Sequence, residues 1–377
     1  MRSIFTFLLL ALTHNACVSQ AEQASLKFQR SETQKVKVGR FESRALWTPT
    51  NAKSAAVIML PGSGPQGPEE MVPGSQTLDG KNAPLFVQMA SPFIEAGFNV
   101  LALGKPGVDF YSDDPAKKFY NIEMLKNLTW QDLLENAQDG IDFLKKQDSV
   151  DVKNIYILGH SEGTQLATDL SKLFASKGLI LLGYSGEDLL TTLSWQLIDR
   201  GIDHFVKIDV DSDKDGFVTK QEAERWPRNF AWEWKPGEGQ VSVEEIRNAS
   251  RNDPKIRQII EATRKSHFCS NGGKCDRGPI YEETVQFGGS IHAFTGELDL
   301  QTRPEEVLKL GEACKLKNKM NCYVEIVPDF QHGFSSPRGP RQHPLLDLTL
   351  GPVDPSFQKI LFQFAKKIYP AGQVTSF

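Results

Sequence analysis

The stretch at 155–163 constrains this chain more than any other. Four apolar residues that favour β-structure run directly into Gly-His-Ser-Glu-Gly at 159–163, and apolar residues then recur at helical spacing through residue 174. This order predicts a buried strand, a tight turn and a helix, with the hydroxyl of Ser161 exposed on the turn. The helix N-terminus beside such a serine offers unpaired N–H groups and a positive dipole end, which stabilise a developing negative charge.

Apolar runs and helical patterns alternate on both sides of this turn, which predicts an α/β fold with a mostly parallel, doubly wound sheet. Thr129 and Asp354 precede helical patterns as N-cap residues, and Asp132 completes a capping box with Thr129. A largely helical insertion interrupts the alternation at 187–284. We expect strands at 26–31, 35–47, 55–60, 98–103, 155–158, 178–183, 284–295 and 321–327, and helices at 85–96, 129–144, 166–174, 189–208, 256–275 and from 355 onward.

Size and composition are those of an ordinary globular protein. The 377 residues allow one large α/β domain with an insertion, or two domains. Hydrophobic residues make up 40% and charged residues 24%, so a large core is available. Because the net charge is −4 and Lys and Arg are scattered, we expect no nucleic-acid partner.

The first 21 residues resemble a secretory signal peptide. Arg2 supplies a positive start, an apolar core follows at 4–12, and small residues follow where cleavage would occur. This core is too short to span a bilayer. We therefore expect a periplasmic or secreted protein. Lipidation at Cys17, with membrane contact, is the alternative, although 14–16 is a poor context for it.

Four further cysteines fall into two close pairs, with polar loops between the partners. An even count in an exported chain predicts disulfides. Zinc binding is disfavoured because neither pair has the spacing of a zinc knuckle. The expected disulfides are Cys269–Cys275 and Cys314–Cys322.

The acidic segment at 211–222 fits the calcium-loop pattern and resembles an EF-hand loop. Its carboxylates would repel one another strongly, and a divalent cation relieves that repulsion. Gly216 makes the sharp turn, and Val218 is the apolar residue that points inward. A solvated acidic turn is the alternative. The expected Ca²⁺ ligands are Asp211, Asp213, Asp215, the Phe217 carbonyl, Thr219 and Glu222.

A weaker copy of this loop follows at 239–245. Gly239, Val241 and Glu245 occupy the turn, inward and closing places, but the early acidic residues are missing. We therefore expect a metal-free partner loop in which Val241 pairs with Val218 across a short β-bridge.

Three separated motifs together resemble the α/β-hydrolase superfamily. They are the pentapeptide at 159–163, Gly-Glu-Leu-Asp at 296–299 and Gln-His-Gly at 331–333, in the chain order serine, acid, histidine. The loop at 60–66 is similar to the oxyanion loop of a bacterial esterase subgroup. The resemblance implies a hydrolase core at 22–186 and 285–377, with 187–284 inserted as a lid.

The resemblance also assigns roles. Ser161 would be the nucleophile, His332 its general base, and Asp299 the acid that orients His332. The backbone N–H groups of Ser63 and Glu162 would form the oxyanion hole.

Alternatives remain at several of these positions. Glu297 competes with Asp299 for the acid, and Gly62 or Gly64 could take the place of Ser63. Three other histidines have plainer explanations as packing or loop residues, and the first of them should point away from the triad: His160, His292 and His343.

The expected function is an exported serine hydrolase that cleaves small-molecule carboxylic esters through an acyl-enzyme, with a calcium-stabilised lid. A serine peptidase or acyltransferase would use the same residues. A catalytically inactive, calcium-dependent binding protein is an alternative of another class.

Overall fold

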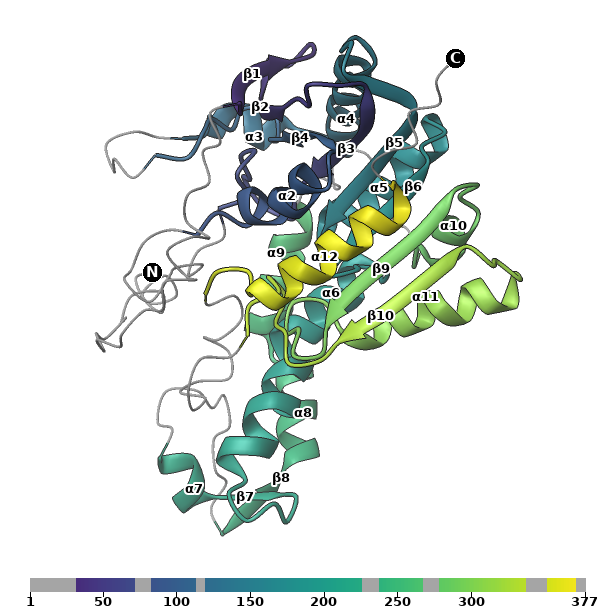
Figure 1. Ribbon diagram of the computed structural model, residues 1–377. Helices are drawn as coiled ribbons and strands as arrows, with labels where there is room; N and C mark the ends of the chain where they lie inside the picture. The colour runs from purple at the N-terminus through teal and green to yellow at the C-terminus, as the bar shows by residue number, and fades with distance from the viewer. Residues whose placement is uncertain are drawn as a thin grey trace, which may run out of the picture.

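An eight-stranded sheet runs through the molecule (Figure 1). The structure is a computed structural model that describes residues 32–71, 83–112, 119–225, 237–266, 278–336 and 351–370. The strand β2 runs antiparallel to β1 and β4, and the other neighbouring pairs are parallel. The predicted mostly parallel sheet is therefore confirmed. In spatial order the strands are β1(Gln34–Val38), β2(Ser43–Thr48), β4(Asn99–Leu103), β3(Ser54–Leu60), β5(Val150–His160), β6(Gly178–Leu182), β9(Ser290–Gly296) and β10(Cys322–Val327).

Helices cover both faces of this sheet. Along β3, Ala56 and Ile58 belong to one core cluster, while Val57 and Met59 belong to the other. This alternation places two hydrophobic layers on opposite faces and explains why β3 is a continuous apolar run. The first layer is covered by α4(Trp130–Lys145), α5(Glu162–Leu173), α10(Tyr281–Val285) and α11(Pro304–Leu316), and the second by α2(Leu85–Glu95) and α12(Pro355–Ile368).

Two predicted helix starts are confirmed. Thr129 and Asp132 form a reciprocal capping box at the start of α4. Asp354 accepts a hydrogen bond from the Ser356 N–H at the start of α12, with Pro355 at the first helical position.

The expected single strand at 35–47 is wrong. It is a hairpin of β1 and β2 with a turn at 39–42, where the Glu42 N–H donates to the Gly39 carbonyl at 3.1 Å. Gly39 has φ +64, and a Cβ there would lie 2.2 Å from Asp139 Oδ2. Neither the turn nor its contact with α4 tolerates a side chain at that position.

The expected strand at 284–295 is also partly wrong. The segment begins in α10, and β9 starts only at Ser290. Thr284 is fully buried and its hydroxyl donates to the Ile280 carbonyl, which holds the local helix. Sequence analysis also missed α3(Ile122–Asn127) and α11.

The insertion leaves the sheet after β6 and returns before β9, and it extends to the bottom of Figure 1. Helical residues continue from 189 to 210, with two wide π-type segments inside the run. Val218 pairs with Val241 as predicted. The elements of the insertion are α6(Leu189–Ser194), η1(Trp195–Asp199), η2(Ile202–Val210), β7(Phe217–Thr219), α7(Lys220–Glu224), β8(Gln240–Ser242), α8(Val243–Asn252) and α9(Pro254–Ser266).

The predicted disulfide between Cys314 and Cys322 is present and joins the end of α11 to the start of β10. Within the ranges given above, no helix has both the length and the apolar character needed to cross a bilayer. Four predictions lie outside the described residues: the signal peptide at 1–21 with Cys17, the strand at 26–31, the Cys269–Cys275 pair, and His343.

Candidate active site

Ser161 lies on the predicted tight turn, between the end of β5 and the first residue of α5. Its φ of +54 is strained for a residue with a side chain. Its N–H donates to the Leu182 carbonyl at the end of β6, at 2.9 Å. A Cβ on Gly159 would lie 2.2 Å from the Gly163 carbonyl oxygen, and one on Gly163 would lie 2.2 Å from the Leu60 carbonyl oxygen. Both glycines are therefore required for strand and helix to pass this closely.

Asp299 and His332 form a buried pair at the same edge of the sheet. They follow β9 and β10, and His332 Nδ1 lies 2.7 Å from Asp299 Oδ2. Asp299 also accepts hydrogen bonds from the Gln301 N–H, the Thr302 N–H and the Thr302 hydroxyl. This set of donors fixes the carboxylate and leaves it facing the imidazole.

Glu297 does not reach this pair. It is exposed, and its carboxylate accepts a hydrogen bond from the Asp329 N–H at 3.2 Å. Of the two candidate acids, Asp299 is the one beside His332.

Ser161 and His332 are brought to one place without a direct bond. Gly183 directly follows the carbonyl that holds the Ser161 N–H, and a Cβ on Gly183 would lie 2.9 Å from His332 Cε1. Although both residues are described, no hydrogen bond joins the Ser161 hydroxyl to the His332 ring in the structure. Catalytic hydrogen bonds of this kind are often long before substrate binds.

The predicted oxyanion loop packs against the serine. A Cβ on Gly62 would lie 3.1 Å from Ser161 Cβ. The Gly62 N–H donates to Glu70 Oε1 at 2.6 Å, so this amide is not available to a substrate. Gly64 has φ +82. With the Gly62 amide engaged, Ser63 stays the predicted loop donor and Gly64 the alternative, together with the Glu162 N–H at the start of α5.

Sequence analysis missed four residues around these groups. Lys105 follows β4 and forms a buried ion pair with Glu162, at 2.8 Å. Thr302 holds Asp299, Gly183 makes room for His332, and Glu70 holds Gly62. The Asp-x-x-Thr spacing at 299–302 is the one local signal that would have indicated such a contact.

His160 has the predicted packing role but does not point away from the triad. It is buried, and its ring centroid lies 4.7 Å from that of His332. Its Nδ1 lies 2.8 Å from Glu70 Oε1, and its Nε2 lies 3.3 Å from the His332 carbonyl oxygen. Burial alone would lower the pKa of His160, but the Glu70 carboxylate raises it overall.

The structure brings three of the four predicted carboxylate ligands of calcium together. Carboxylate oxygens of Asp211, Asp213 and Asp215 lie within 4.8 Å of one another. The Gly216 N–H donates to Asp211 Oδ2, and Gly216 has φ +89, as the sharp turn requires. Three hard oxygen donors at this separation fit a Ca²⁺ ion.

Glu222, the fourth predicted carboxylate ligand, is arranged differently. Glu222 Oε1 accepts hydrogen bonds from the N–H and hydroxyl of Ser212. Its Oε2 accepts them from the N–H and hydroxyl of Thr219, in a capping box at the start of α7. Desolvation would raise the pKa of Glu222, but these hydrogen bonds lower it to about 2. Phe217 and Thr219 lie in β7, where the Phe217 N–H donates to Asp215 Oδ1. Glu222 would have to turn from its cap to reach a metal.

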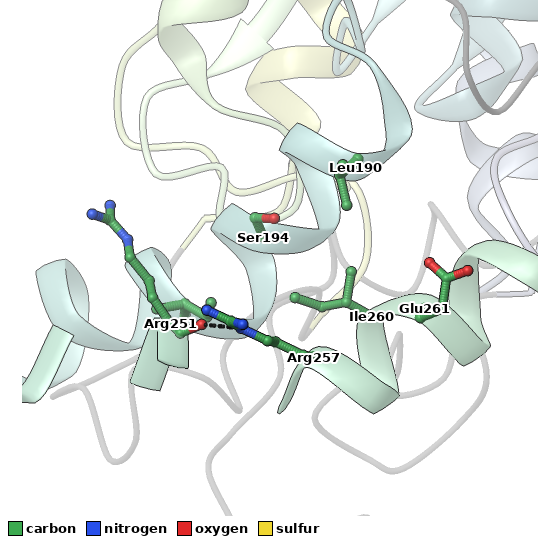
Figure 2. Close-up of a pocket in the computed structure, with 7 residues that line it drawn as sticks. Leu190, Ser194, Arg251, Arg257, Ile260 and Glu261 are labelled. Carbon is green, nitrogen blue, oxygen red and sulfur yellow. Dashed lines mark hydrogen bonds between the residues drawn. The ribbon is translucent and has the colours of Figure 1, made fainter. Parts of the chain in front are cut away.

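A cavity of about 370 Å³ lies in the insertion (Figure 2). Its lining comes from α6, η1, α8 and α9 and includes Leu190 and Ile260. Arg257 Nε donates to the Arg251 carbonyl across one side of it, at 2.9 Å. Because none of the three triad candidates lines this cavity, it is distinct from the candidate active site.

Comparisons with known proteins add solved structures of similar fold. No family model matches the sequence, and no curated protein matches it. The chain is similar to Est1E from Butyrivibrio proteoclasticus, with 13% identity, 89% of this chain and 98% of that chain covered, and a TM-score of 0.46. The same four values describe a proline iminopeptidase from Mycobacterium smegmatis. A thermophilic esterase from Thermogutta terrifontis is 11% identical, with 89% of this chain and 99% of that chain covered and a TM-score of 0.43.

These similarities are too distant to carry an argument about function. The strand order of the sheet and the strand–turn–helix at Ser161 are together those of the α/β-hydrolase fold.

His292, the predicted core histidine, generates a pH-dependent test. It lies between the rings of Tyr323 and Phe364, and burial together with the charge of Lys367 lowers its pKa to about 4. As the pH falls below about 6.5, His292 is therefore protonated in the unfolded chain before it is protonated in the folded chain. The stability that neutral His292 contributes is complete above that pH and is lost as the pH falls through 4.

We expect His292→Phe to remove about 3 kcal/mol of this pH dependence between pH 7 and pH 4. Urea unfolding of both proteins across that range measures it. Parallel stability curves for the wild type and the variant would contradict a neutral, buried His292.

Proposed function

We propose that this chain is a serine hydrolase that cleaves carboxylic esters through an acyl-enzyme. The observation that carries the proposal is the strained Ser161 turn at the same sheet edge as the buried Asp299–His332 pair. A strained serine and a hydrogen-bonded His–Asp pair on separate strand ends have little structural purpose apart from nucleophilic catalysis.

In the first half of the reaction, the Ser161 hydroxyl attacks the ester carbonyl carbon and its proton passes to His332 Nε2. Asp299 holds the Nδ1–H of that ring and stabilises the imidazolium. The carbonyl oxygen becomes an oxyanion that accepts hydrogen bonds from the Ser63 and Glu162 N–H groups. Collapse of this intermediate breaks the ester C–O bond, and the leaving alcohol takes the proton from His332.

In the second half, water attacks the acyl carbon on Ser161. His332 removes a proton from this water and returns it to the Ser161 oxygen as the carboxylic acid leaves. The Lys105–Glu162 pair at the start of α5 fixes the residue whose N–H serves the oxyanion in both halves.

We further propose that Ca²⁺ binds at 211–222 and stabilises the insertion over the active site. The helical run from 189 ends at Asp211, the first predicted ligand. Near its other end, Gln196 donates to the Gln301 carbonyl at 2.7 Å and Arg200 donates to the Leu300 carbonyl at 2.6 Å. These two carbonyls belong to the loop that carries Asp299, so one helical run connects the calcium loop to the catalytic acid.

The hydrolase proposal predicts covalent labelling at one residue. A fluorophosphonate probe should label the wild type and fail on Ser161→Ala, because the serine oxygen forms the bond to phosphorus. Short-chain nitrophenyl esters should be cleaved at least 100-fold faster than matched peptide anilides. Ser185→Ala is the matched control, since that serine lies near the same sheet edge but outside the turn. Equal labelling of wild type and Ser161→Ala would contradict the proposal, and faster anilide cleavage would favour a peptidase.

The calcium proposal predicts a metal-dependent melting temperature. At 10 mM Ca²⁺ and a dissociation constant of roughly 0.1–1 mM, binding adds about 2 kcal/mol to the free energy of unfolding. Asp213→Ala should remove this increase. Glu224→Gln, an exposed acid two residues after Glu222, should keep it. Identical melting with Ca²⁺ and with chelator would contradict the proposal, and two ions per chain would contradict a metal-free partner loop.

A further inference from the structure

Glu70 is a buried carboxylate that has no part in the reaction steps above. It lies in the loop between β3 and α2, is 1% exposed, and has φ +47, a strained value for glutamate. Its Oε1 accepts the Gly62 N–H at 2.6 Å and lies 2.8 Å from His160 Nδ1. Its backbone carbonyl accepts the Leu85 N–H at the start of α2. Both its side chain and its backbone are therefore fixed.

The two partners of His160 determine its charge. Glu70 Oε1 on one side and the His332 carbonyl oxygen on the other are both hydrogen-bond acceptors. With Glu70 ionised, each ring nitrogen of His160 donates a proton to its partner, which makes His160 an imidazolium. Glu70 and His160 are thus a buried ion pair with side chains 1% and 3% exposed.

This pair joins three parts of the candidate active site. Glu70 holds the oxyanion loop through Gly62, His160 precedes Ser161 in the turn, and the His160 ring holds the backbone of His332. With the Gly62 N–H directed to Glu70, the next amide along the loop belongs to Ser63, whose neighbour Gly62 packs against Ser161. The position of that amide therefore depends on the Glu70 bond.

We propose that Glu70 is a positioning residue for ester hydrolysis: paired with His160, it orients the oxyanion loop so that the Ser63 N–H faces the acyl oxygen on Ser161. This inference rests on the proposed hydrolase function. Glu70 touches neither substrate nor the reacting atoms, and it acts through Gly62 and His160.

Two substitutions separate this role from simple core packing. In Glu70→Gln, an amide oxygen in the place of Oε1 accepts both the Gly62 N–H and a His160 Nδ1–H, so both hydrogen bonds survive without the negative charge. In Glu70→Leu, the volume is similar but both hydrogen bonds are lost. Glu69→Leu is the matched control, because Glu69 is adjacent and partly buried, while the hydrogen bonds to Gly62 and His160 belong to Glu70.

The kinetic test measures kcat and KM for nitrophenyl acetate and the affinity for a trifluoromethyl ketone, which forms a tetrahedral adduct with a catalytic serine. Loss of one oxyanion donor typically costs 10²–10³-fold in kcat. We expect Glu70→Leu to lower kcat by about 100-fold with KM changed by less than threefold, and to weaken ketone binding in proportion to kcat/KM. The kcat of Glu70→Gln should be at least about tenfold higher than that of Glu70→Leu, and the kcat of Glu69→Leu should stay within about threefold of the wild type.

A kcat for Glu70→Leu no lower than that of Glu69→Leu would overturn the inference, as would a rise in KM at constant kcat. Circular dichroism at the assay temperature verifies that each variant is folded. A wild type that neither cleaves esters nor reacts with fluorophosphonate would instead remove the hydrolase proposal itself.

Nitrogen-15 NMR of histidine-labelled protein tests the ion pair without any activity. In the Ser161→Ala background we expect two protonated ring nitrogens on His160 at pH 7.5, and a neutral ring once Glu70→Leu is added. The signal is assigned by its loss in His160→Gln. A neutral His160 beside an intact Glu70 would overturn the inference, whatever the kinetics.

Discussion

The close passage of α5 over the ends of β3 and β5 determines where the groups of the candidate active site can lie. It requires glycine at 159 and 163, and it places Ser161 at φ +54 with its N–H held by the Leu182 carbonyl. The packing of the buried sheet offsets this backbone strain, because its hydrophobic layers hold strand and helix in place from both faces. Once Ser161 is fixed there, the loops after β3, β9 and β10 have one common point to face.

The central motif and its two distant partners could be predicted because each depends on local sequence. Strand patterns place Asp299 and His332 after strands, and parallel strands bring their carboxyl ends to one edge. Glu70 and Lys105 could not be predicted in the same way. Glu70 meets His160 across 90 residues and Lys105 meets Glu162 across 57, and no local pattern records such pairs.

The same distinction separates the correct and incorrect strand boundaries. The β3 prediction held because a fully buried strand is a continuous apolar run. The segment at 35–47 failed because its turn depends on a contact between Gly39 and Asp139 of α4. Val218 and Val241 were paired correctly because both loops place an apolar residue at the inward position, and these two side chains are buried in one small core with Val210 and Ile246.

The insertion has a small hydrophobic core of its own, separate from the two layers on the sheet. Its small core holds the acidic loop, while Gln196 and Arg200 contact the loop that carries Asp299. Burial lowers the pKa of Arg200 to about 10, which still leaves it charged at neutral pH beside that acid. The insertion therefore contacts the loop that carries Asp299 through charged and polar groups.

A crystal structure of the fluorophosphonate adduct would show the proposed catalytic arrangement, because its phosphoryl oxygen occupies the place of the oxyanion. We expect phosphorus bonded to Ser161 Oγ, with the phosphoryl oxygen roughly 2.7–3.1 Å from the amide nitrogens of both Ser63 and Glu162. His332 Nε2 should lie within hydrogen-bonding distance of Ser161 Oγ. A phosphoryl oxygen directed to solvent, or phosphorus bonded to another residue, would contradict it.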